Sequence, residues 1–180
     1  MPAYVALLRG LNVGGRNPVG MADLAACFED AGYLDVRTYI QSGNVLFTTD
    51  ATGGPALETE VERMLEDRLE KPILAVVRSR DELAEIVAAA PPDHGSQALR
   101  SDVLFLKHPL TPDEVLAQMP DLREGVDEVA AGPGVVYFSR VAARATETRF
   151  TRFMGMPVFR RITMRNWRTT TRLLELLDGR

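Results

Sequence analysis

Residues 38–47, TYIQSGNVLF, decide the fold that this sequence predicts. β-branched and aromatic side chains are concentrated in residues 36–41 and again in residues 45–49, which is typical of strands. The Ser42-Gly43-Asn44 sequence between them is typical of a tight turn, because glycine adopts the backbone angles of hairpin turns without a steric cost. The stretch therefore predicts a β-hairpin.

Strand and helix patterns alternate on both sides of this hairpin. Apolar runs predict strands over residues 4–8 and 73–77, and apolar side chains at helical spacing predict helices over residues 21–31 and 55–69. The resulting order is β-α-β-β-α-β, which is that of the ferredoxin-like split β-α-β unit.

The rest of the chain repeats this order in outline, with no repeat at the level of residues. Capping-box sequences predict helix starts at Ser79 and Thr111, and strand patterns cover residues 103–106, 126–130 and 135–139. Closing helices are predicted over residues 147–154 and 163–177. We therefore predict an α+β fold of two ferredoxin-like halves, residues 1–78 and 79–180, packed as one compact unit with C-terminal helices.

The apolar segments and the cysteine content bound the class of protein. Cys27 is the one cysteine, so no intrachain disulfide forms, and its neighbours at helical spacing predict a packed, reduced thiol. The first residues lack the pattern of a secretory signal, and no later segment approaches the ~20 apolar residues of a membrane span. We expect a cytoplasmic protein with no membrane partner.

The formal net charge of -4 conceals an uneven distribution. Residues 148–180 contain eight arginines and only two acidic residues, whereas acidic residues predominate in residues 1–147. Two interpretations fit this asymmetry: an anionic partner, or docking of the arginines onto the acidic part of the same chain.

Topology predicts where a ligand would bind. The first two strands of a split β-α-β unit are parallel, so residues 9–17 and 41–44 should meet at one edge of the sheet, beside the positive amino end of the first helix. The side chains and glycines of these loops suit an anion such as a phosphate or carboxylate. The predicted ligand-binding residues of this edge are Arg9, Gly10, Asn12, Gly14, Gln41, Ser42, Gly43 and Asn44. The alternative is a tight turn with Arg9 paired to an acidic neighbour.

The start of the last predicted helix extends the same hypothesis. Thr163 is the predicted N-cap, which would hold Arg165 and Asn166 near the positive end of the helix and facing the same anion. On a helix that begins there, Arg165, Arg168 and Arg172 share one side.

Catalytic and metal-binding patterns are weak. His94 and His108 stand in loop sequences with no serine or cysteine tied to them, so the sequence assigns no catalytic residue and leaves open whether the protein is an enzyme. Two interpretations of Asp93 and Asp102 are equally consistent with the sequence: a catalytic base in a cleft between the halves, or carboxylates solvated at the surface. There is no Cys/His cluster, and we predict no metal and no cofactor.

Nucleic acid is the second candidate partner. The β-α-β-β-α-β order is also that of RNA-recognition domains, and the C-terminal arginines would contact phosphates. The third predicted strand, however, lacks the exposed aromatic side chains that stack on bases in such domains. A third hypothesis is an interaction protein with no ligand.

Three stretches, YVALLRGLNVGG, TYIQSGNVLF and FTRFMGMPVFRRITMRNWRTTTRLLEL, together resemble the bacterial family known as domain of unknown function 1697. The resemblance spans essentially the whole chain. It implies a two-part α+β architecture with ferredoxin-like character, and it implies no established activity. The recurring motif positions of that family correspond to the eight edge residues named above and to Thr163, Arg165 and Asn166.

Overall fold

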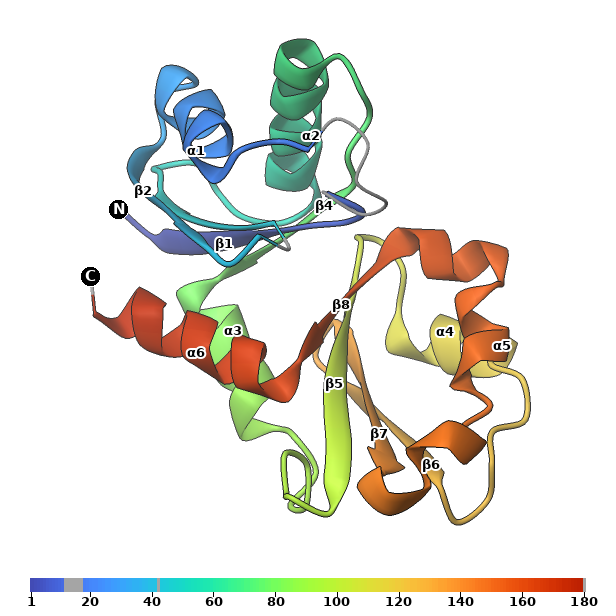
Figure 1. Cartoon of the computed structure of the whole chain (residues 1–180). Coiled ribbons are helices and arrows are strands. Elements are labelled where there is room, and N and C mark those ends of the chain that lie inside the picture. Colours follow the sequence, from blue (N-terminus) through green and yellow to red (C-terminus); the bar gives the residue numbers. More distant parts are fainter. Residues whose placement is uncertain (12–17, 42, 180) are drawn as a thin grey trace. The chain divides into compact units, whose positions relative to one another are not determined.

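The computed structural model describes residues 1–11, 18–41 and 43–179, which form two units (Figure 1). Unit 1 comprises Met1–Leu83 and Leu173–Arg180, and unit 2 comprises Ala84–Arg172. Within the described residues, no helix is both long enough and apolar enough to cross a membrane.

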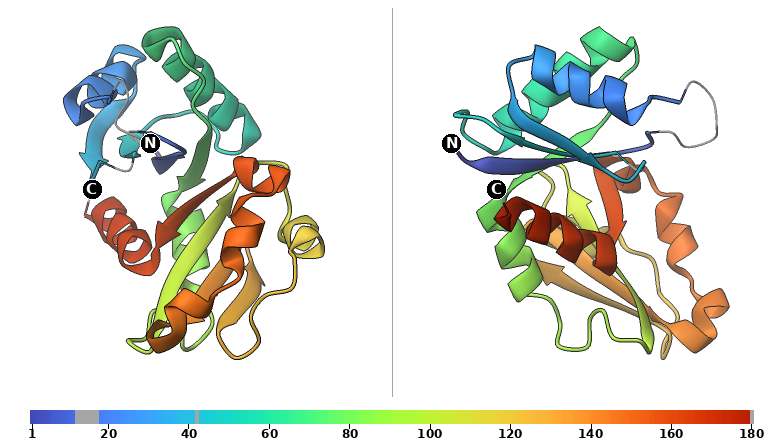
Figure 2. Two further views of the ribbon diagram at one scale, coloured as in Figure 1. Left: turned by 45° about the vertical axis from the view of Figure 1, so that its right-hand side comes forward. Right: turned by 60° about the vertical axis from the view of Figure 1, so that its left-hand side comes forward.

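Unit 1 contains a four-stranded sheet with two helices on one face (Figures 1 and 2). Its strands are β1 (Ala3–Leu8), β2 (Leu34–Tyr39), β3 (Asn44–Thr48) and β4 (Ala75–Ser79), in the order β2-β3-β1-β4. All neighbouring strands are antiparallel, and the helices are α1 (Met21–Asp30) and α2 (Pro55–Leu69). The predicted β-α-β-β-α-β unit is confirmed.

Alternating side chains of the sheet build the core of unit 1. Tyr4, Ala6 and Leu8 of β1 belong to one buried cluster with apolar residues of both helices. Aromatic rings anchor this cluster: the centroid of Phe47 lies 5.3 Å from that of Phe28 and 4.8 Å from that of Tyr33. Such pairs contribute about 0.5–1.5 kcal/mol each beyond the area that they bury.

Unit 2 has the same strand order. Its strands are β5 (Leu99–Leu106), β6 (Asp127–Gly132), β7 (Val135–Val141) and β8 (Ile162–Asn166), arranged β6-β7-β5-β8 with antiparallel neighbours. The first crossover is α4 (Pro112–Gln118), and the second contains α5 (Phe150–Met154) between 3-10 helices over Ala142–Glu147 and Pro157–Arg161. α3 (Arg80–Ala88) precedes β5, and α6 (Trp167–Asp178) follows β8. The chain is an α+β protein with two ferredoxin-like halves.

The prediction of one helix over residues 163–177 is wrong at its start. The last helix, α6, begins at Trp167, and the preceding residues form β8, in which Thr163 pairs with Phe105 and Arg165 with Val103 of β5. Asn166 caps the helix instead of Thr163: its Oδ1 accepts a hydrogen bond from a backbone N–H of the first turn at 2.8 Å. Arg165 is therefore on a strand and does not share a helix face with other arginines.

Candidate functional site

The described ends of the two polar segments of unit 1, at Leu8 and Gly43, contact each other. The Leu8 N–H at the end of β1 donates to the Gly43 carbonyl at 2.8 Å, and the Arg9 N–H donates to the Leu74 carbonyl at 2.9 Å. Gly43 has φ +87°, and a Cβ there would lie 3.0 Å from the Cβ of Leu8. Only glycine allows this close approach of the two loops.

The predicted ligand-binding residues of this edge have different environments. Asn44 is fully buried, and its Nδ2 donates to the Tyr39 carbonyl at 2.9 Å, so this amide closes the hairpin turn. Gly10 and Gln41 are exposed, and Arg9 is half-buried. Three further predicted residues lie outside the described residues: Asn12, Gly14 and Ser42.

The C-terminal residues of the prediction belong to unit 2. Thr163 and Arg165 are 1% and 7% exposed, and a terminal guanidinium nitrogen of Arg165 donates to the Thr163 hydroxyl at 2.8 Å and to the Met164 carbonyl at 2.9 Å. Burial lowers the pKa of Arg165 to about 10. Asn166 is exposed and lines a pocket of unit 2.

This pocket has a volume of about 400 Å³ and lies at a strand-end edge of the second sheet. β7 and β8 are both antiparallel to β5, so they run parallel to each other and their carboxyl ends meet beside the start of β5. α6 begins at the same edge (Figure 1), where its amino end carries a partial positive charge. We call this cavity the arginine pocket, after Arg100, Arg140 and Arg168, which line it.

The three arginines give the pocket a positive charge. Arg100 and Arg140 are direct cross-strand neighbours on β5 and β7, a placement in which like charges repel, and Arg168 extends from the first turn of α6. The Nε of Arg140 is buried and has no hydrogen-bond partner among the described residues. Within the same residues, none of the three arginines forms an ion pair at 4.0 Å or less.

One carboxylate faces these guanidinium groups. Asp102 lies opposite Asn166 in the ladder of β5 and β8, and it lines the arginine pocket. Burial raises the pKa of the Asp102 carboxyl above its ordinary value, and the charge of Arg140 opposes that shift. With one carboxyl group against three guanidinium groups, the pocket favours an anion and retains one hydrogen-bond acceptor.

An indole ring forms another part of the wall. Trp167 stands at the junction of β8 and α6, and the His94 ring packs against it at a centroid distance of 4.9 Å and an interplanar angle of 89°. Gly95 has φ +85°, and a Cβ at that position would overlap the indole. The N–H of Gly95 donates to the Ser101 hydroxyl at 2.8 Å, which ties this loop to β5. The loop therefore holds the indole in one position.

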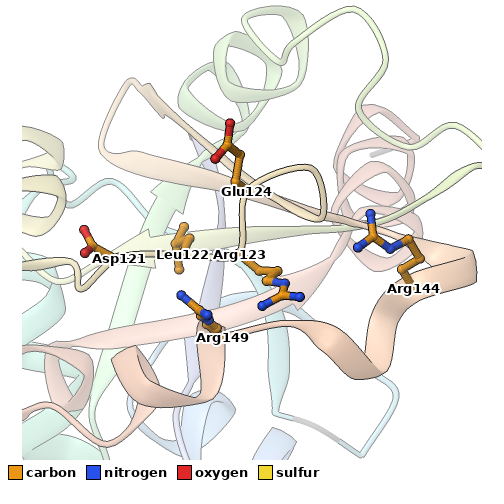
Figure 3. A pocket seen from close by; sticks show the side chains of 6 residues that line it. All are labelled: Asp121, Leu122, Arg123, Glu124, Arg144 and Arg149. Atoms are coloured by element: carbon orange, nitrogen blue, oxygen red, sulfur yellow. The ribbon is translucent and has the colours of Figure 1, made fainter.

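A larger hollow of about 550 Å³ lies elsewhere in unit 2 and also contains arginines (Figure 3). Glu147 compensates two of them, because its carboxylate accepts from Arg144 at 2.6 and 3.1 Å and lies 4.0 Å from Arg123. Acidic residues also line this hollow: Asp121 and Glu124. Its charge balance is closer to neutral, so the arginine pocket is the better anion site despite its smaller volume.

Sequence reasoning identified this pocket only in part. It singled out Asn166 as a ligand-binding residue and Asp102 as a candidate base, but it assigned no site to Arg140 or Trp167. The available signal was alternation: Arg100 and Asp102 are two residues apart at the start of a strand, so they share a face.

Comparisons with known proteins agree with this fold. No curated protein matches the chain. The solved structure of the conserved bacterial protein SP0830 from Streptococcus pneumoniae is similar, with a TM-score of 0.87 and 25% sequence identity over 98% of each chain. A family model described as "Protein of unknown function (DUF1697)" matches residues 1–137. The chain therefore belongs to the DUF1697 family.

Proposed function

We propose that this protein binds a small anionic ligand, phosphorylated or nucleotide-like, in the arginine pocket of unit 2. One observation carries the proposal: the pocket is lined by three arginines that form no ion pair among the described residues, and the Nε of one of them, Arg140, is buried without a hydrogen-bond partner. Burying a donor without an acceptor costs about 1–3 kcal/mol, and more when the group is charged. A bound anion supplies that acceptor.

The geometry of the pocket also supports this ligand class. Arg100 and Arg140 share one face of the sheet on β5 and β7, and Arg168 belongs to the first turn of α6, so three elements supply donors to one volume. Charge-assisted hydrogen bonds contribute about 1.5–3 kcal/mol each, so two or three of them give useful affinity for a phosphate group. The amino end of α6 adds a further favourable charge.

The glycine-rich edge of unit 1 stays a prediction. Among its described residues, solvent reaches Arg9, Gly10 and Gln41. The Asn44 side chain is instead used to close the hairpin turn. A cytoplasmic location likewise stays part of the proposal. We rank nucleic acid below a small ligand, because Arg165 is buried in β8 and is not available to a phosphate backbone.

Calorimetric titration with pyrophosphate tests the proposal. Wild-type protein should bind, and Arg140→Gln should weaken binding about 10- to 100-fold, the equivalent of one charge-assisted hydrogen bond. Arg144→Gln is the matched control, because it removes the same charge from the hollow that Glu147 compensates. Absence of binding by the wild type, or an equal loss in both variants, would overturn the proposal.

A further inference from the structure

The arginine pocket contains the one tryptophan of the sequence. We propose that its ligand is a nucleoside phosphate, with the base against the Trp167 indole and the phosphate toward Arg140. This inference rests on the proposed function and names the class of ligand for the same site.

The indole is a prepared surface for a planar group. The His94 ring packs perpendicular to the Trp167 indole, and Gly95 approaches the indole so closely that no side chain fits between them. A ring that is already fixed loses little conformational entropy when a ligand packs against it. Aromatic side chains that lie beside basic groups are the common means of holding the base and the phosphate of single nucleotides.

The size of the pocket indicates a ligand larger than a free phosphate. A volume of about 400 Å³ falls within the range of about 300–1,000 Å³ that is usual for pockets of complete small molecules. A phosphate that contacts the guanidinium groups fills only part of the pocket. The side lined by Trp167 is left for another part of the ligand. An aromatic base has the shape and the apolar surface for that part.

Asp102 gives a second indication. A carboxyl group beside Arg140 offers no favourable contact to a ligand that is anionic throughout, whereas it accepts hydrogen bonds from a ligand that also carries donors. A nucleoside phosphate has both features, because sugar hydroxyls and exocyclic amines are donors. The combination of Arg140, Asp102 and Trp167 therefore fits a nucleoside phosphate better than it fits a simple anion.

Intrinsic fluorescence provides a local test, because Trp167 is the sole tryptophan. Adenosine monophosphate should quench this fluorescence and bind at least about ten-fold more tightly than ribose 5-phosphate, the gain expected from one stacked base. Excitation at the red edge of the indole band avoids absorption by adenine. Calorimetry on Trp167→Leu should show the two ligands binding equally, with affinity for ribose 5-phosphate retained.

The outcomes separate this inference from the proposed function. If wild-type protein binds adenosine monophosphate and ribose 5-phosphate equally, and Arg140→Gln weakens both, the pocket is an anion site and the nucleoside assignment is wrong. If neither compound binds while pyrophosphate does, the nucleoside assignment is wrong and the anion site stands. If none of the three compounds binds, or if Arg140→Gln changes no affinity, both proposals fail. The wild-type comparison is decisive even if Trp167→Leu does not fold.

Discussion

Replacing Gly95 with alanine should displace the indole that lines the arginine pocket. Gly95 has φ +85°, a conformation that costs an L-residue about 1–2 kcal/mol. The new Cβ would also overlap Trp167, and accommodating extra bulk in a packed site costs about 1–3 kcal/mol. We expect Gly95→Ala to lower the free energy of unfolding by about 2–5 kcal/mol.

Gly32→Ala is the matched control. Gly32 has φ +93°, and a Cβ there would meet no heavy atom within 4 Å. Backbone strain is therefore the only cost expected in this variant, without a steric overlap. Urea denaturation followed by circular dichroism gives both free energies, and their difference should be about 1–3 kcal/mol. The emission of Trp167 should shift in Gly95→Ala and stay unchanged in Gly32→Ala. Equal destabilisation with unchanged emission in both variants would refute the placement of the indole against Gly95.

Other contacts give further tests of the structure. Glu58→Ala removes a fully buried carboxylate that accepts from the Arg78 guanidinium and from the Val77 N–H, both at 3.1 Å, and should cost about 3–5 kcal/mol in urea denaturation. A cost below about 1 kcal/mol, the range of an exposed pair, would contradict that burial. The Asp127 carboxylate accepts three hydrogen bonds, from two backbone N–H groups and a threonine hydroxyl. Asp127→Ala removes all three and should lower the thermal midpoint in calorimetry by about 4–16 °C, corresponding to about 2–4 kcal/mol. Burial lowers the pKa of His94 below its ordinary value of 6.5, so the unfolded chain takes up a proton before the folded chain does. Stability should therefore fall as the pH decreases below about 6.5, and His94→Gln should show a flatter decline; identical pH profiles would argue against a buried imidazole.

The sequence predicted the first half of the fold well, because its signals are local. The hairpin at residues 38–47 and the helices on either side of it have clear turn residues and regular apolar spacing. The strand order then follows from the usual topology of a split β-α-β unit.

β8 was missed because its conformation depends on a distant partner. Thr163 and Asn166 both suit a helix cap, so the local sequence allows the helix to start at either one. Pairing with β5 decides between them, since Arg165 lies opposite Val103, which is far away in the sequence. Tertiary strand pairing here overrides a local helical pattern.

The same strand-end geometry occurs at two places in the fold, and the sequence pointed to only one of them. Parallel strand ends beside a helix amino end occur in both units, but glycines drew attention to the edge that follows β1. At the arginine pocket the decisive residues are separated in sequence: Arg100 and Arg140 become neighbours only through the register of β5 and β7. No local pattern reveals that register.

A crystal structure of the protein soaked with tungstate tests the central claim most directly, because tungstate mimics phosphate and its metal gives an anomalous signal. We expect a tungstate peak in the arginine pocket, with an oxygen within hydrogen-bond distance of the Arg140 Nε. A pocket without this peak, in which the Arg140 Nε instead donates a hydrogen bond to a carboxylate of the protein, would contradict the proposed anion site.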